Sequence, residues 1–261
     1  MRALSIAATG MNAQQMRVEV ISNNLANMST TAYNARRAEF ADLHYQQLAR
    51  PGAIASATGA VVPTGVQLGL GVRAAAVTME PQQGTIQQTN GDLDVAIQGD
   101  GYLEVTLPSG AQGYTRDGAL KRTGDGLLVT SDGHPVVPDI TIPDDTRSIS
   151  INPEGEVYAY FIDRVEPEML GQLSLVNFTN EKGLEALGSN LYAETGASGT
   201  PLVGFPGEDG LGFFRQGYLE ESSVDAVREI TDLIEAQRGY EMNAKVITAA
   251  DQMMSATTQI R

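Results

Sequence analysis

Two stretches at opposite ends of the chain repeat small or apolar residues in alternating steps of three and four. The first runs from Leu4 to Met28 and the second from Ala226 to Met254. This spacing places the repeated side chains along one side of an α-helix, as in the seam of a coiled coil. We therefore expect a long helix at each terminus. Each helix should pack along its stripe against the other helix and against helices of further subunits.

Polar residues interrupt both stripes, at Gln14, Gln237 and Asp251. Polar seam positions cost stability but can fix the register of paired helices. A helical hairpin within one monomer is the alternative to assembly, and the polar positions favour assembly. The predicted assembly seam comprises Leu4, Met11, Val18, Ile21, Leu25, Ala226, Ile230, Leu233, Tyr240, Ala244, Ile247 and Met254.

The middle of the chain alternates short apolar runs with glycine-rich turns. The motifs TRDG, TGDG and TSDG recur between Thr115 and Gly133, and Asp-Gly is the strongest short indication of a β-hairpin. Tryptophan is absent and aromatic residues make up only 6% of the chain, so the core is expected to be aliphatic. The fold class is predicted to be α+β, with a coiled-coil-like bundle of terminal helices and a central all-β domain of short hairpins.

The expected domains are discontinuous in sequence. Residues 1–30 and 220–261 should form the terminal helical domain, and residues 76–195 the central β domain. Residues 31–75 and 196–219 should connect the two, with an extended arm at 46–72. The arm is rich in Ala, Gly, Thr and Pro and carries one charged residue, Arg50. An arm this apolar is expected to lie against another surface.

Charge and cysteine content exclude several classes of protein. The formal net charge is −15, and an acidic chain is repelled by nucleic-acid phosphates. Without cysteine, the chain has no disulfides, thiol nucleophiles or cysteine-ligated metals. No apolar stretch has the length of a membrane span or the form of a cleavable signal peptide. We expect no nucleic-acid partner and no membrane insertion.

Candidate catalytic residues are few. The two histidines, His44 and His134, stand far apart in sequence without a triad pattern, and Asp92 with Asp94 is explained by a solvated strand edge. The Asp-Gly turns lack the spacing of a calcium loop, and Gly69-Leu70-Gly71 lacks the helix that a dinucleotide site requires. We expect no catalytic, metal-binding or cofactor-binding residue and no cofactor, and the chain is not expected to be an enzyme.

Several motifs, in order along nearly the whole chain, resemble those of the flagellar rod and hook axial proteins. SNNLANMS begins at Ser22, NGDLDVAIQGDGY at Asn90, YTRDG at Tyr114, QGYLE at Gln216 and QRGYE at Gln237. The residues that carry the resemblance include Asn23, Asn24, Leu25, Asn27, Tyr33, Phe40, Asp94, Gly99, Gly101, Tyr102, Arg116, Gly118, Gln237, Arg238 and Tyr240.

Within this family, the length and the arm resemble the distal-rod member. A proximal-rod paralogue and the hook protein are the alternatives inside the family. Outside it, the alternatives are a β-rich surface adhesin and a hydrolase that uses acidic residues of the β domain. The residues of the arm that carry the resemblance, and that are expected to stiffen the rod, are Arg50, Pro51, Gly52, Pro63, Gly65, Gln67 and Gly69.

The resemblance implies a structural protein of the bacterial flagellar basal body that serves motility. Its subunits would polymerise as a helical tube that crosses the periplasm and transmits torque from motor to hook. Implied partners are further copies of the chain, proximal rod proteins, hook protein, P-ring and L-ring proteins, the flagellar type III export apparatus and the rod cap with its muramidase. Export would need no cleaved signal peptide.

Two residues after the first helix depart from the pattern of the family. Ala32 stands where the family usually has glycine, and Asn34 stands where it usually has lysine. Because alanine takes positive φ less readily than glycine, the turn after the first helix is expected to differ locally.

Overall fold

The computed structural model describes residues 2–49, 65–162, 164, 166–208 and 210–259. The chain forms two compact units. We call Met1–Ala26, Arg36–Thr78 and Asp225–Arg261 the terminal unit, and Asn27–Ala35 with Met79–Val224 the central unit.

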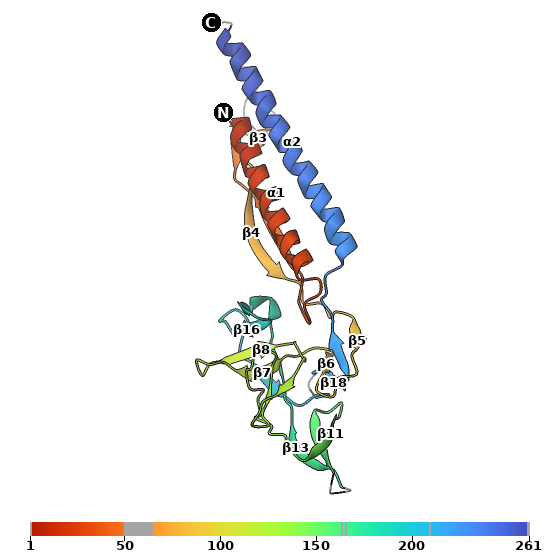
Figure 1. Ribbon diagram of the computed structural model, residues 1–261. Coiled ribbons are helices and arrows are strands. Elements are labelled where there is room, and N and C mark those ends of the chain that lie inside the picture. Colours follow the sequence, from red (N-terminus) through yellow and green to blue (C-terminus); the bar gives the residue numbers. More distant parts are fainter. Residues whose placement is uncertain (1, 50–64, 163, 165, 209, 260–261) are drawn as a thin grey trace. The chain divides into compact units, whose positions relative to one another are not determined.

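The terminal unit is built on two long helices, α1 (Arg2–Ala26) and α2 (Ala226–Gln259). They lie side by side and run antiparallel (Figure 1). Asp225 caps α2, because its carboxylate accepts hydrogen bonds from the backbone N–H groups of Val227 at 3.0 Å and Arg228 at 3.2 Å. Such a cap contributes about 0.5–2 kcal/mol to helix stability. The predicted terminal helices are therefore present.

Among the described residues, four strands complete the terminal unit, where the sequence led us to expect a connecting region. β1 (Arg36–Asp42) pairs with β4 (Val72–Met79), and β2 (Tyr45–Ala49) pairs antiparallel with β3 (Val66–Gly69). β1 packs against α1, so residues 36–78 belong with the helices rather than between domains. The alternation of Val66, Leu68 and Leu70 indicated a strand or hairpin at β3. It did not indicate that these strands belong with the helices, because most of their side chains are exposed.

In the residues of the central unit that the structure describes, the regular structure is β strand apart from one short 3₁₀ turn, Glu181–Gly183. Its largest sheet has the order β15-β16-β8-β7, a three-stranded sheet has the order β11-β12-β13, and the other strands pair in twos. The strands are β5 (Ile86–Gln88), β6 (Val95–Gln98), β7 (Leu103–Thr106), β8 (Gln112–Thr115), β9 (Lys121–Arg122), β10 (Leu128–Val129), β11 (Thr146–Ile151), β12 (Glu156–Phe161), β13 (Glu168–Gln172), β14 (Leu175–Asn177), β15 (Glu185–Gly188), β16 (Leu191–Ala193), β17 (Leu202–Gly204), β18 (Phe213–Gln216) and β19 (Tyr218–Glu220).

The glycine-rich stretch 196–219 is part of the central unit, not an irregular connection. β17 pairs with β14, β18 pairs with β6, and β19 pairs with β5. Phe214 on β18 is buried in the core. Frequent Gly and Pro hid these strands, because the runs between them are only three or four residues long.

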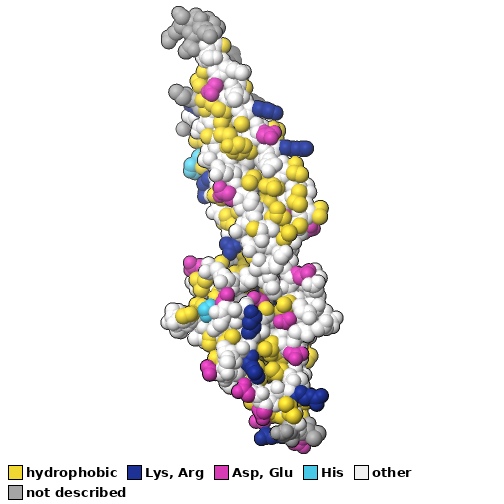
Figure 2. Space-filling view, in the orientation of Figure 1, with side chains coloured by type: hydrophobic (Ala, Val, Ile, Leu, Met, Phe, Trp, Pro, Cys, Tyr) yellow, Lys and Arg dark blue, Asp and Glu magenta, His cyan; other side chains and the backbone are white. Residues whose placement is uncertain are grey.

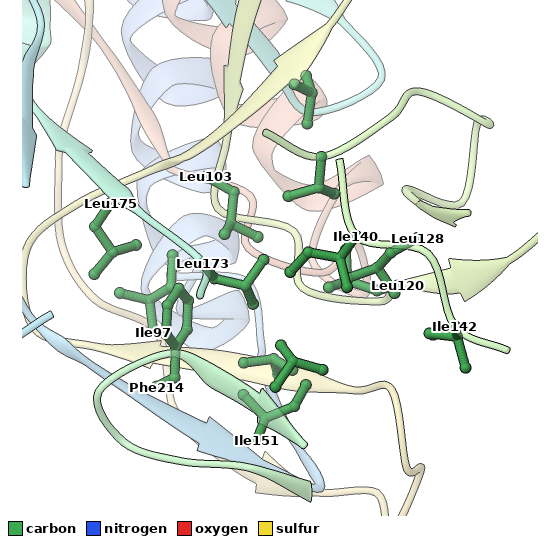
Figure 3. Close-up of a cluster of buried hydrophobic side chains, with 14 of the residues drawn as sticks. Ile97, Leu103, Leu120, Leu128, Ile140, Ile142, Ile151, Leu173, Leu175 and Phe214 are labelled. Carbon is green, nitrogen blue, oxygen red and sulfur yellow. The ribbon is translucent and has the colours of Figure 1, made fainter. Parts of the chain in front are cut away.

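The main core of the central unit is aliphatic, as its composition predicted. Side chains from several strands converge in it (Figure 3), and Ile97, Leu103 and Leu173 are fully buried. Burying each contributes about 1.5–3 kcal/mol. The sequence did not predict a second cluster, in which the aromatic rings gather edge to face. Its members are Met79, Tyr102, Tyr114, Val176, Phe178 and Tyr192.

The three Asp-Gly motifs do not behave alike. Gly126 and Gly133 adopt positive φ, at 84° and 88°, as turn glycines do. Gly118 in TRDG is different, because a β-carbon there would overlap the carbonyl oxygen of Val95. This glycine serves close backbone contact between segments, and the hairpin predicted at this motif is wrong.

Candidate assembly interface

The contact between α1 and α2 contains a reciprocal pair of glycines and amides. Gly10 faces Asn243, and a β-carbon at Gly10 would lie 2.9 Å from the Asn243 side-chain nitrogen. Gly239 faces Gln14, with a β-carbon there 3.1 Å from the Gln14 Cδ atom. Each helix thus supplies a glycine followed one turn later by an amide. Both pairs fit one antiparallel register.

Small side chains let the two helices approach closely. The side chains buried in this part of the fold include Ala7, Ala13, Ala236 and Ala250. At one flank the Arg17 guanidinium donates to Asp232 at 2.8 Å, with both side chains 33% exposed. An ion pair this accessible contributes about 0–1 kcal/mol, so shape rather than charge holds the pair.

One buried atom in this contact is unsatisfied. The side-chain oxygen Oε1 of Gln14 has no hydrogen-bond partner among the described residues. A buried acceptor without a partner costs about 1–3 kcal/mol. The helix pair is therefore less stable than its length suggests.

Asn24 ties together three elements of the terminal unit. Its side-chain nitrogen donates to the carbonyl of Arg36 at 2.8 Å and to the Glu229 carboxylate at 3.2 Å. Its side-chain oxygen accepts from the Arg36 N–H at 2.9 Å. The buried amide therefore pairs with the backbone of β1 while it also holds the first turn of α2.

The structure places the predicted seam residues in three classes of exposure. Ile21 is buried. The half-buried members are Leu4, Met11, Val18, Leu25, Ala226, Leu233, Ala244 and Ile247. The exposed members are Ile230, Tyr240 and Met254.

The face of α2 that meets α1 is rotated from the predicted stripe. Ala236, Asn243 and Ala250 lie one residue before Gln237, Ala244 and Asp251, which amounts to about 100° of helix rotation. The predicted stripe consists mainly of apolar residues, whereas the face that packs closely on α1 consists of small residues and amides. The repeated spacing Gly-x-x-x-amide in both termini could have indicated this face.

A second apolar stripe on α2 points away from that contact. Val227, Ile230 and Ile234 are 76%, 47% and 45% exposed. Their spacing of three and four residues places them together, opposite Ala236. Figure 2 shows apolar side chains gathered over the first part of α2. α2 is thus apolar on two opposite sides, and α1 covers one of them.

In the central unit, three motifs separated in sequence converge on Arg116. Its guanidinium donates to the carbonyls of Gly99 at 2.9 Å and Gly101 at 3.1 Å. It also donates twice to one oxygen of Glu220, at 3.0 and 3.2 Å, and both side chains are buried. The other oxygen of Glu220 accepts from the Gly84 N–H at 3.0 Å. This network fastens the last strand of the unit, β19.

The comparisons with known proteins span the whole chain. Family models match at residues 4–33 (flagella basal body rod protein), 96–159 (flagellar hook protein FlgE/F/G D1 domain) and 215–260 (flagellar basal body rod FlgEFG protein C-terminal). The flagellar basal-body rod protein FlgG of Caulobacter vibrioides is 52% identical over all of both chains. The chain belongs to the FlgG family of flagellar basal-body rod proteins.

Other FlgG proteins agree with this assignment. That of Agrobacterium fabrum is 50% identical over 99% of both chains, and that of Bacillus subtilis is 35% identical over 100% of this chain and 99% of its own. FlgG membership makes the chain a structural protein of the flagellar basal-body rod, not a member of an enzyme class. In the described part of the chain, no helix combines the length and hydropathy of a membrane span.

The remaining FlgG motif residues have varied surroundings. Asn27 accepts a hydrogen bond from the Thr30 hydroxyl, and the carbonyl of Tyr33 accepts from the N–H of Ser223. The Asp94 carboxylate accepts from the Thr89 hydroxyl at 2.6 Å. The exposed motif side chains are Asn23, Phe40, Gln237 and Arg238.

Tyr102 is fully buried beside Arg116. Burial, and after it the Glu181 carboxylate that accepts from its hydroxyl at 3.1 Å, raise the pKa of Tyr102 far above its ordinary value. The tyrosine is therefore neutral at any physiological pH and acts as a hydrogen-bond donor.

Much of the FlgG-like arm lies outside the described residues, including Arg50, Pro51, Gly52 and Pro63. Gly65 precedes β3, which contains Gln67 and Gly69. Gln67 lies opposite Gln47 in the hairpin of β2 and β3. This hairpin carries exposed apolar side chains, namely Tyr45, Leu48, Val66 and Leu68.

Ala32 adopts a φ of 53°, in the left-handed region that favours glycine. Alanine thus takes here the conformation that glycine takes more readily. Its N–H donates to the Glu220 carbonyl at 2.9 Å, and the surrounding structure holds it there. Asn34 is 4% exposed.

Proposed function

We propose that this chain polymerises as the helical tube of the distal rod, the rigid shaft that transmits torque from the flagellar motor to the hook. The full-length identity with FlgG proteins supports the distal rod over a proximal-rod paralogue, the hook protein or a surface adhesin. The tube crosses the periplasm.

The single observation that carries self-assembly is the outward stripe of α2, formed by Val227, Ile230 and Ile234. Fully burying such a side chain contributes about 1.5–3 kcal/mol, and α1 already occupies the opposite side of α2. Arg238, Glu241 and Lys245 continue the same side with both signs of charge, a mixture that copies of one helix can pair. The occupant we propose is a helix of a second copy of this chain.

The seam predicted from the sequence takes part in the same assembly. Its exposed members Ile230 and Tyr240 would be covered by the neighbouring copy. Its half-buried members Leu233, Ala244 and Ile247 lie closer to the side that meets α1. α2 would thereby contact α1 of its own subunit on one side and a helix of the neighbouring subunit on the other.

The arm is proposed to stiffen the rod by lying against a neighbouring subunit. An isolated two-stranded hairpin is marginally stable in water, and the hairpin of β2 and β3 exposes Tyr45, Leu48 and Val66 by more than half. A second surface that covers these side chains would stabilise the hairpin and link the two subunits.

The remaining partners follow from the place of the rod in the flagellum. Proximal rod proteins and hook protein meet the two ends of the tube, and the P-ring and L-ring proteins surround it. The type III export apparatus delivers the subunits, and the rod cap with its muramidase precedes the growing end.

The experiment is a substitution in the outward stripe, Ile230→Asp. A charge in a packed apolar contact is strongly unfavourable, so the variant should remain monomeric at concentrations where the parent forms straight tubes. Electron microscopy and sedimentation measure this. Asn12→Asp, on an exposed part of α1, adds the same charge and should polymerise like the parent. Normal tubes from Ile230→Asp would contradict the proposal.

A further inference from the structure

The charge of the chain is divided unequally between its two units. The sequence ranges of the terminal unit contain ten Lys and Arg residues and nine Asp and Glu residues, a formal net charge of +1. The ranges of the central unit contain seven basic and 23 acidic residues, a formal net charge of −16. The two values add to the −15 of the whole chain. The acidity of the protein is therefore a property of its central unit.

The basic side chains of the central unit are too few to neutralise its carboxylates. Arg116, Arg122 and Arg164 each form an ion pair with a carboxylate. Exposed carboxylates such as Asp139 and Glu185 form none among the described residues. Figure 2 shows acidic side chains spread over the visible face of this unit. A surface that carries mainly one sign of charge repels another copy of itself.

The surface proposed for assembly has the opposite character. The outward stripe of α2 is apolar, and the charges that follow it along the helix have both signs. Burial of apolar area is favourable whatever the charge of the rest of the chain, whereas repulsion between exposed charges weakens as salt screens them. Attraction and repulsion between copies therefore belong to different units and respond differently to salt.

The range of the repulsion depends on the salt concentration. The Debye length is about 30 Å in 0.01 M salt and about 8 Å in 0.15 M salt, and a small domain is about 30 Å across. Central units of neighbouring copies therefore repel each other in dilute salt and are largely screened at 0.15 M.

We propose that the central unit makes polymerisation depend on ionic strength. Its negative charge holds subunits apart in dilute salt, and screening by mobile cations lets the terminal units join. The dependence rests on the assembly through α2 proposed above. The cations act as diffuse counterions and not as ligands of a site, so any monovalent cation serves. Screening that removes about 1.4 kcal/mol of repulsion per added subunit lowers the critical concentration tenfold.

The test measures the critical concentration for tube formation, by sedimentation and electron microscopy, in about 10 mM and about 150 mM NaCl. The value should be at least about tenfold lower in the higher salt. Choline chloride at equal ionic strength should act like NaCl, because screening does not depend on the identity of the ion. Equal values in both concentrations of NaCl would overturn the inference and leave the polymer itself intact. Tubes at no salt concentration would contradict both, and an effect of NaCl alone would show a bound ion instead of screening.

A quadruple variant assigns the salt effect to the central unit. Asp139→Asn, Glu154→Gln, Glu185→Gln and Glu194→Gln neutralise exposed carboxylates and leave the unit with a charge of −12. Repulsion scales with the product of the two charges and should fall to about 0.56 of its value, so a tenfold salt effect should shrink to about three- to fourfold.

The matched control changes the same four positions but keeps their charges, with Asp139→Glu, Glu154→Asp, Glu185→Asp and Glu194→Asp. It should keep the salt dependence of the parent. A salt effect in the neutralised variant as large as that of the parent would overturn the role of the central unit.

Discussion

In the central unit, Ile97, Leu103 and Leu173 are fully buried by neighbouring strands, whereas several of the side chains buried in the terminal unit are alanines. The large apolar side chains of α2 lie elsewhere, and Val227, Ile230 and Ile234 face outward. The central unit thus buries a large aliphatic core within one chain, although it also exposes apolar side chains such as Ile162, Leu202 and Val203. The terminal unit has a core of small residues and leaves large apolar side chains of α2 exposed, which the proposed assembly would cover.

The two units also differ in how completely their buried polar groups are paired. In the central unit, the buried Arg116 and Glu220 satisfy each other and the backbone around them. In the terminal unit, Gln14 Oε1 has no partner among the described residues, and the pair of Arg17 with Asp232 is accessible to water. Buried polar pairing is thus complete around Arg116 in the central unit and incomplete at Gln14 in the helix contact of the terminal unit.

The largest effect is expected in the central unit, from Arg116→Ala. The substitution leaves Glu220 buried without a counter-charge, which costs about 3–5 kcal/mol. Urea unfolding followed by circular dichroism measures the loss. The double variant Arg116→Met with Glu220→Met should lose less than either single change, because it leaves no buried charge. A loss of stability below about 1 kcal/mol for Arg116→Ala would mean that its ion pair contributes no more than a surface pair such as Arg17 with Asp232 in the terminal unit.

In the terminal unit, Asn24→Ala is expected to have the next largest effect. It removes both hydrogen bonds to the backbone of Arg36 and the one to Glu229. Buried groups left without partners give a loss of about 2–3 kcal/mol, visible as a lower midpoint of helix unfolding. Asn24→Asp should lose at least as much, because its carboxylate would face the carbonyl of Arg36 and the carboxylate of Glu229. Asn12→Ala at an exposed site of α1 should change little. If Asn24→Ala unfolds like the parent, this unit gains nothing from the buried amide.

The reciprocal glycines can be tested with Gly10→Leu. A large side chain at Gly10 overlaps Asn243, and overpacking typically costs about 1–3 kcal/mol. Adding Asn243→Ala should restore part of the stability by making room, measured as a coupling energy in a double-mutant cycle. Additive effects of the two changes would show that these residues do not meet in solution.

The sequence predicted both terminal helices and the central β domain. Apolar residues recur every three to four positions in a helix with one buried face, and every two positions in a strand with one buried face. It did not predict which side of α2 meets α1. Apolar periodicity marks Ile230 and Tyr240, but close helix contact used Gly239 and Asn243, whose role depends on a partner helix more than 200 residues away. The strands in residues 196–219 likewise depend on pairing with segments far away in the sequence. β18 and β19 are recognisable only from their partners β6 and β5.

The smallest expected effect concerns Ala32, which sits in the otherwise well-packed central unit at a φ of 53°. Ala32→Gly relieves a left-handed strain of about 1–2 kcal/mol. It also removes a buried methyl group worth about 0.8 kcal/mol and adds about 0.5–1 kcal/mol of unfolded-chain entropy. These contributions nearly cancel, so the free energy of unfolding should change by less than about 0.5 kcal/mol. Ala32→Val keeps the strain and adds a β-branched side chain, and should lose more than about 2 kcal/mol. If the valine variant unfolds in urea like the parent, the left-handed turn is not the conformation in solution, and the hydrogen bond from Ala32 to Glu220 would be lost with it.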